Sequence, residues 1–266
     1  MMGPQNQPEK DFPWWLLCVV AVGVWLFYEV LANEDYSAVL ATLSAGITIT
    51  VLVSVFAYAT ACCMGLLLAV GSLSRSRVIR QLCRFYIEVM RGVPIIVLLL
   101  YVAFVLVPAL VAGWNWLAEP LGLGLARARD VPLLWRAVLA LCLAYSAFLA
   151  EIFRAGLQAV DKGQIEAAQA LGLSGWQRFR HIVFPQAFRT VLPPLGNDFV
   201  AMVKDSSLVS VLGVGDVTQL AKVTAAGNFK YFETYNVAAL IYLTMTIGLS
   251  LVMRRLEHRL KSRQER

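Results

Sequence analysis

Six polar or charged side chains interrupt an apolar stretch near residues 191–214. They are Asn197, Asp198, Lys204, Asp205, Ser206 and Ser207. At about 100° per residue in a helix, the four between 197 and 205 fall on one stripe roughly 120° wide. A charged residue at the centre of a membrane helix costs about 2.5–3.5 kcal/mol, so this stripe is expected to face partner groups or a wet pathway rather than lipid.

Two interpretations of this stripe stay open. In one, the carboxylates and the ammonium bind a solute that crosses the membrane. In the other, Lys204 forms a structural ion pair with Asp205 or with a neighbouring helix. Pro193 and Pro194 are expected to open the start of the helix and to free backbone carbonyls for solute or water.

A polar segment at 161–185 carries helix start and stop signals. Asp161 with Gln164, and Ser174 with Gln177, match capping boxes. Gly172 is placed to end the first helix in a left-handed conformation, and Pro185 is expected to stop the second. The segment therefore predicts two short helices joined by a tight glycine turn.

The two short helices also carry a surface suited to docking. Each has an apolar stripe, made by Ile165, Ala168 and Leu171 in the first and by Trp176, Phe179, Ile182 and Val183 in the second. Small side chains at Ala167 and Ala168 allow a partner to approach the backbone, and Glu166 offers a charge to a partner's arginine or lysine. An interfacial amphipathic helix and a DNA-reading helix-turn-helix are the alternatives.

Other chemistry has no support in the sequence. The five cysteines show no CxxC or Cys/His spacing, and His181 and His258 are isolated, so no metal site is expected. The motifs GxxxxGK[ST], HExxH and GxSxG are missing. The chain is therefore expected to be no enzyme and to bind no ATP itself. Two pairs spaced i,i+3, Glu88 with Arg91 and Glu151 with Arg154, are expected to be salt bridges at helix ends.

Composition identifies the setting of these elements. Of 266 residues, 59% are hydrophobic and only 15% are charged, with a mean hydropathy of +0.67, which excludes a soluble domain. Six apolar runs are long enough to cross a bilayer as helices. They lie near 14–32, 43–73, 93–113, 133–153, 191–214 and 235–253. We therefore predict an all-α integral membrane protein with six transmembrane helices.

The distribution of arginine and lysine predicts the orientation. The loops after the second and fourth spans hold five basic residues each and the tail holds six, whereas the intervening loops hold none, three and two. Basic loops stay inside, so both termini and the segment 161–185 are expected in the cytoplasm. The net charge of +6 is then a topology signal and does not indicate nucleic-acid binding. The first span is expected to be an uncleaved anchor.

The segment at 161–185 resembles a known signature. The order Glu166-Ala-Ala, three residues, Gly172, nine residues, Ile182-Val-Phe-Pro185 is similar to that of permease subunits of bacterial ABC importers, with Phe184 where leucine is usual. The flanks resemble the polar amino acid branch of that family. They are Phe85-x-x-Glu88-x-x-Arg91-Gly92-x-Pro94, the run 150–156, Pro185-Gln-Ala-Phe-Arg189 and the run 204–208. The resemblance covers roughly residues 36–257.

The resemblance implies a type I importer permease in the bacterial inner (plasma) membrane. It assigns coupling to an ATPase to Glu166, Ala167, Ala168, Gly172, Ile182 and Pro185. The implied partners are two ABC ATP-binding subunits that hold ATP and Mg, a second permease subunit, and an extracytoplasmic amino acid-binding protein. The expected divisions are an N-terminus and extra helix at 1–35, the transmembrane domain at 36–257 with the coupling loop 161–185, and a basic tail at 258–266.

Two rival functions remain. An ion-coupled secondary transporter would use the polar stripe, but it usually shows repeat symmetry with broken helices, and none is apparent. A membrane scaffold would tolerate the capped loop but would leave the polar stripe unexplained.

Overall fold

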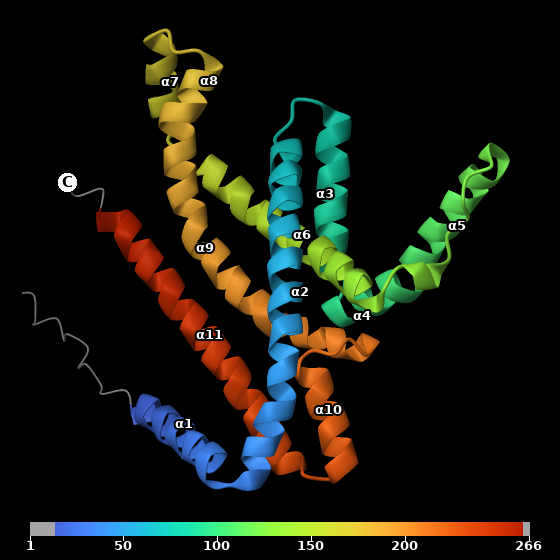
Figure 1. Ribbon diagram of the computed structural model, residues 1–266. Coiled ribbons are helices and arrows are strands. Elements are labelled where there is room, and N and C mark those ends of the chain that lie inside the picture. The colour runs from blue at the N-terminus through green and yellow to red at the C-terminus, as the bar shows by residue number, and fades with distance from the viewer. Residues whose placement is uncertain (1–13, 263–266) are drawn as a thin grey trace, which may run out of the picture.

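The computed structural model describes residues 14–262, and within this range it is helical with no β-strand (Figure 1). The helices are α1 (Trp14–Ala32), α2 (Glu34–Ser72), α3 (Arg77–Gly92), α4 (Ile95–Tyr101), α5 (Val107–Ala118), α6 (Leu133–Gln158), α7 (Lys162–Ala170), α8 (Gly175–Arg178), α9 (Phe184–Asp205), α10 (Val217–Asn228) and α11 (Tyr231–Ser262). Two π-helical segments, η1 (Val102–Leu106) and η4 (Phe179–Val183), join α4 to α5 and α8 to α9. Three 3-10 segments are η2 (Glu119–Leu121), η3 (Ala128–Asp130) and η5 (Ser206–Leu212).

Four of the described helical units are long and apolar enough to cross a membrane. They are Glu34–Ser72, Ile95–Leu121, Leu133–Gln158 and Tyr231–Leu256. The first expected span forms the shorter apolar helix Leu17–Ala32. The fifth is wrong as one helix over 191–214, because α9 ends at Asp205 and η5 follows. The all-α membrane fold is confirmed, whereas the count of six spans stays a prediction.

The expected divisions of the chain do not coincide with helix ends. The boundary at 35/36 falls in the first turn of α2, and α11 runs across the boundary at 257/258 as far as Ser262. The N-terminal segment 1–13 and the last part of the tail, 263–266, lie outside the described residues.

The main core forms where α2 crosses α6. Ala57 and Ala61 of α2 and Leu141 and Leu149 of α6 are fully buried there. A Cβ atom added to Gly65 would lie 2.9 Å from the carbonyl oxygen of Ser146. Glycine and alanine thus let the two backbones approach closely, as membrane helices require when lipid provides no hydrophobic drive between them.

A second core holds α10 and α11 against the first half of α2. Leu43, Val217 and Val237 are fully buried in it. A Cβ atom at Gly46 would lie 2.5 Å from the backbone nitrogen of Val217, so no larger residue fits without a backbone shift. Lys230 also forms an ion pair with Asp35 at 2.5 Å, which closes this end of the bundle.

A buried arginine ties α6 to the π-helical segment η1. The N–H of Val107 donates to the carbonyl of Val102, five residues earlier. In the same i to i+5 pattern the carbonyl of Ala103 would pair with the N–H of residue 108, but this residue is Pro108 and has no N–H. Arg136, 7% exposed, donates to Ala103 at 2.6 Å and to Val131 at 3.0 Å, and also to the carbonyl of Ala128. Arg136 therefore satisfies a carbonyl that the π-helix leaves unpaired.

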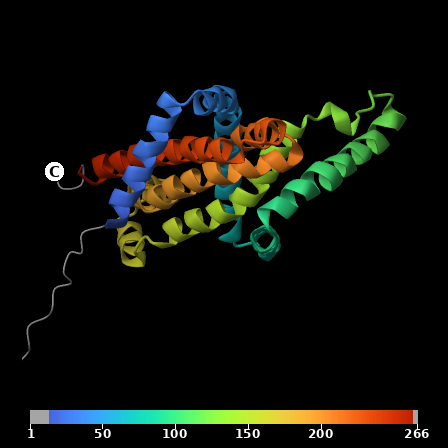
Figure 2. The same ribbon diagram turned by 90° about the horizontal axis from the view of Figure 1, so that it is seen from below.

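The helix α5 extends away from the rest of the bundle, on the other side of the molecule from α7 (Figures 1 and 2). The returning chain is fixed to it by Asn115, whose amide donates to the carbonyl of Ala126 at 2.9 Å and accepts from the N–H of Ala126 at 2.8 Å. This end of the molecule is thus a hydrogen-bonded arm rather than an irregular loop.

Candidate functional site

The segment 161–185 forms a capped helical hairpin, as the sequence predicts. The Asp161 carboxylate accepts from the N–H of Gln164 at 3.2 Å. Ser174 and Gln177 form a full capping box, with N–H to side-chain distances of 3.4 and 2.8 Å. Gly172 has a φ of 76°, the left-handed conformation that glycine adopts without a steric cost.

Side chains also join the two halves of the hairpin. Arg178 donates to the side chain of Gln169 at 2.9 Å, and Gln186 donates to the side chain of Gln164 at 2.6 Å. A chain of ring contacts runs from Trp176 through Phe179 and Phe184 to Phe188, with centroids 5.8–5.9 Å apart. These contacts make the hairpin one body with the start of α9.

The prediction that Pro185 stops the second helix is wrong. The chain stays helical from Gly175 through η4 into α9, and Pro185 lies in the first turn of α9. The N–H of Phe184 donates to the carbonyl of Phe179 in the π register, and a proline at the start of an α-helix needs no N–H partner. No break therefore separates the hairpin from α9, and Figure 1 shows α9 carrying α8 and α7 at its end.

The outer surface of the hairpin differs in part from the expected one. Glu166 and Ala167 are exposed, and Leu171 and Trp176 are 80% and 70% exposed. Ala168 is only 3% exposed, so it packs inside the hairpin and offers no surface to a partner. Ile182 is half-buried. The hairpin therefore exposes two large apolar side chains and one carboxylate, none of which the described chain covers.

An apolar cavity of about 300 Å³ lies between the base of the hairpin and the bundle. Leu66 of α2 and Phe153 of α6 line one side, and Phe184 and Phe188 of α9 line the other. This apolar space adjoins the contact between α6 and α9, since Val191 of α9 also lines it.

The structure places the six polar residues of α9 and η5 in different surroundings. Asp205 accepts a hydrogen bond from Tyr145 of α6 at 2.8 Å, and Asp198 is half-buried. Lys204 and Ser207 instead line a pocket of about 360 Å³ against α10 and α11. Asn197 is exposed, and buried Ser206 bonds the carbonyl of Val203 at 2.7 Å. Asp205 is thus bonded to Tyr145 rather than to Lys204.

The two prolines of α9 are not at its start, where they were expected. Because the helix continues from the hairpin, Pro193 and Pro194 lie inside α9. Next to these prolines, the backbone carbonyl of Leu195 accepts a hydrogen bond from the hydroxyl of Tyr58 at 2.5 Å. Tyrosines of α2 and α6 therefore face the same helix as Asp198 and Asp205.

Comparison with known proteins decides the family. Residues 61–262 match the model of the binding-protein-dependent transport system inner membrane component. The chain belongs to this family.

Relatives of the permease subunit match over most of their length. This chain is 34% identical to the glutamine transport system permease protein GlnP of Escherichia coli (strain K12) over 230 residues, which cover 85% of this chain and 98% of that protein. It is 32% identical to the arginine transport system permease protein ArtQ of Bacillus subtilis (strain 168), with 86% and 99% covered. A chain of the crystal structure of an amino acid ABC transporter with histidines matches with a TM-score of 0.70 and 34% identity, covering 86% of this chain and 97% of that one.

Family membership identifies a multi-pass subunit of the inner membrane that is not itself the catalytic part of its transport system. The matched region begins at residue 61, inside α2, so α1 lies outside it. The resemblance to ABC importer permeases is confirmed.

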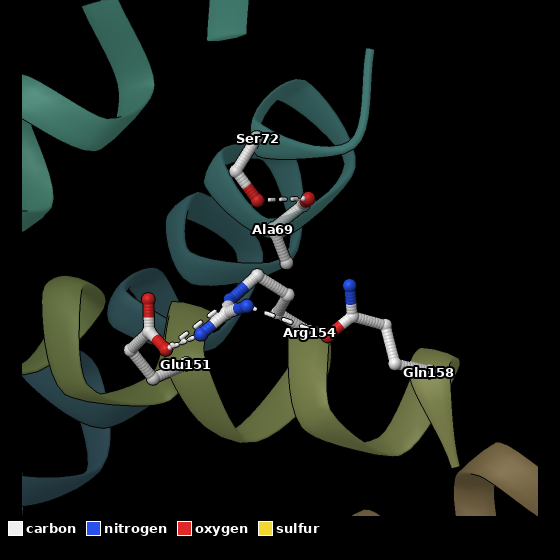
Figure 3. A network of polar contacts seen from close by, with 5 residues as sticks. All are labelled: Ala69, Ser72, Glu151, Arg154 and Gln158. Carbon is white, nitrogen blue, oxygen red and sulfur yellow. Dashed lines mark hydrogen bonds and ion pairs between the residues drawn. The ribbon is translucent and has the colours of Figure 1, made fainter. Parts of the chain in front are cut away.

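One of the two expected salt bridges of the permease forms. Arg154 pairs with Glu151 and also donates to Gln158 at 3.3 Å. Figure 3 shows this group along one side of α6, beside the end of α2 that carries Ala69 and Ser72. Between Glu88 and Arg91 no ion pair is found. Arg91 instead lies 6.0 Å from the ring centre of Phe148, because α3 packs against α6.

Sequence reasoning missed the tyrosines of the polar site. Tyr145 lies 60 residues from Asp205, and Tyr58 lies 137 residues from Leu195. A tyrosine in an apolar span gives no local signal of which helix its hydroxyl will meet.

Proposed function

We propose that this chain is the permease subunit of an ATP-driven importer for polar amino acids, working by alternating access. Its partners are two ABC ATP-binding subunits that hold ATP and Mg, a second permease subunit of the same or a related sequence, and an extracytoplasmic amino acid-binding protein. Both termini and the hairpin face the cytoplasm. The names of GlnP and ArtQ, which refer to glutamine and arginine transport, support this class of substrate.

The observation that carries the proposal is the unbroken helical path from the hairpin to the polar site. It runs from Gly175 through η4 to Asp205. At 1.5 Å per residue, the 22 residues of α9 span about 33 Å, the thickness of a membrane core. The path has no break at Pro185, so a displacement of the hairpin is passed directly to α9.

This geometry gives each part a role in the transport cycle. When the ATPase subunits close, they bring together the exposed tips of the hairpins, at Leu171 and Trp176. The base of α9 moves into the cavity beside Phe153, and Asp198 and Asp205 change position relative to α2 and α6. Carboxylates that bind the ammonium group of an amino acid in one arrangement release it in the other.

Reconstitution tests the proposal against an ion-coupled secondary transporter. The chain is placed in vesicles with its co-purified ATPase subunits and binding protein, and uptake of labelled amino acids is measured with ATP or with an ion gradient alone. Uptake that requires ATP and the binding protein supports the proposal. Uptake driven by the gradient in the absence of ATP would contradict it.

A further inference from the structure

We propose that α3 is a binding surface for anionic phospholipid at the membrane surface beside the α2–α3 turn. This inference rests on the membrane location of the family and goes beyond the import activity.

The first observation is that one side of α3 fixes its position. Ile87 is buried, and the hydroxyl of Tyr86 lies 3.0 Å from both the carbonyl of Leu143 and the hydroxyl of Ser146 in α6. Cys83 approaches α2 so closely that a Cβ atom at Gly71 would lie 2.5 Å from its sulfur. The helix therefore cannot rotate to hide its other faces.

The second observation is an exposed apolar stripe on the same helix. Val78, Leu82 and Phe85 are 69%, 63% and 68% exposed, and Val89 continues the row. At about 100° per residue the four fall within roughly 60° of one another. Nothing in the described chain covers this stripe.

The third observation is a basic stripe beside the packed face. Arg77, Arg84 and Arg91 repeat every seven residues, and Arg80 lies in the same sector. From 75 to 91 the chain holds five arginines and one acidic residue, Glu88. Arg80 is bonded to the carbonyl of Ser74 at 3.0 Å. None of the described side chains forms an ion pair with Arg75, Arg77 or Arg84.

These faces together identify the occupant by charge and polarity. A helix that is held against two membrane-crossing helices and exposes an apolar stripe meets acyl chains there. The basic stripe lies about 140° around the helix from the apolar stripe. Guanidinium groups without an ion pair are suited to bidentate binding of phosphate. A phospholipid with a net negative headgroup provides both, whereas phosphatidylcholine carries a compensating cation.

Native mass spectrometry of the detergent-solubilised transport complex, titrated with phosphatidylglycerol or phosphatidylcholine, tests the proposal. We expect the wild-type protein to retain phosphatidylglycerol in preference to phosphatidylcholine. The double variant Arg77→Gln/Arg84→Gln should lower the affinity for phosphatidylglycerol roughly 10- to 30-fold, because each arginine at an anionic surface contributes about a factor of five. Arg77→Lys/Arg84→Lys should keep most of the preference. The charge-matched control is Arg127→Gln/Arg129→Gln, on two exposed residues of the segment between α5 and α6.

Three results would overturn the proposal. They are equal retention of the two lipids by wild type, equal losses in the α3 variant and the control, and loss of an ATPase subunit from the α3 glutamine variant with lipid retention unchanged. The last result would assign α3 to a protein partner. Lipid retention is measured without transport, so failure of the proposed import function would leave this test intact.

Discussion

Gly156 of α6 lies directly against Val191 of α9, so that a Cβ atom at position 156 would overlap Cγ1 of Val191. Gly156→Ala should destabilise the complex by about 1–3 kcal/mol, the usual cost of overpacking, and should lower uptake because α9 is displaced. Val191→Ala in the same chain should restore much of both. Thermal unfolding of the purified complex and vesicle uptake measure the effect.

The matched control for this pair is Gly113→Ala, since nothing lies within 4 Å of a Cβ atom there. It should leave unfolding and uptake near wild type. Equal effects of Gly113→Ala and Gly156→Ala would show that the contact with Val191 is not the cause.

The hydrogen bond between Tyr145 and Asp205 should matter for transport more than for assembly. Hydrogen bonds to charged groups contribute about 1.5–3 kcal/mol, so Tyr145→Phe and Asp205→Asn should each reduce uptake roughly tenfold or more. Asp198→Asn should also reduce uptake. ATP hydrolysis by the assembled complex should be partly retained in all three.

The exposed Glu119 provides a control, and Glu119→Gln should behave as wild type. Unchanged uptake kinetics in both aspartate variants would remove the pathway role of α9.

Arg136 and Pro108 should be energetically coupled. Arg136→Met leaves the carbonyl of Ala103 without a donor, which costs about 1–3 kcal/mol for a buried group. Adding Pro108→Ala restores a backbone N–H near that carbonyl and should recover about 1 kcal/mol of the loss. A double-mutant cycle of thermal unfolding measures the coupling, and strictly additive effects would refute this explanation of η1.

The hairpin was predictable because its signals are local. Asp161 and Ser174 cap the N–H groups three residues later, and Gly172 ends the helix that precedes it. The structure shows each of them in this expected role. Pro185 was misjudged because its effect depends on where the helix register begins. A π-helical turn before Phe184 moves the proline into a first turn, where it is tolerated.

The polar site was only half visible in the sequence. The carboxylates on α9 were predicted, but Tyr58, Tyr145 and the separation of Lys204 from Asp205 depend on how α2, α6 and α11 pack. One of the three basic residues assigned to the loop before the fourth span is Arg136, which the structure buries at the start of α6. Contacts between spans are set by tertiary packing, which no single window of sequence contains.

The most direct test of the coupling role combines Glu166→Arg with Gly172→Ala, with Gly175→Ala as the control because a Cβ atom there meets only the end of Arg178, at 3.9 Å. The alanine at 172 must adopt a left-handed backbone at a cost of about 1–2 kcal/mol, and the arginine reverses the charge offered to the ATPase. ATP-driven uptake and co-purification of the ATPase subunits are measured together. We predict that both fall strongly in the double variant and stay normal in the control. Wild-type uptake and assembly in the double variant would contradict the claim that this hairpin couples ATP hydrolysis to transport.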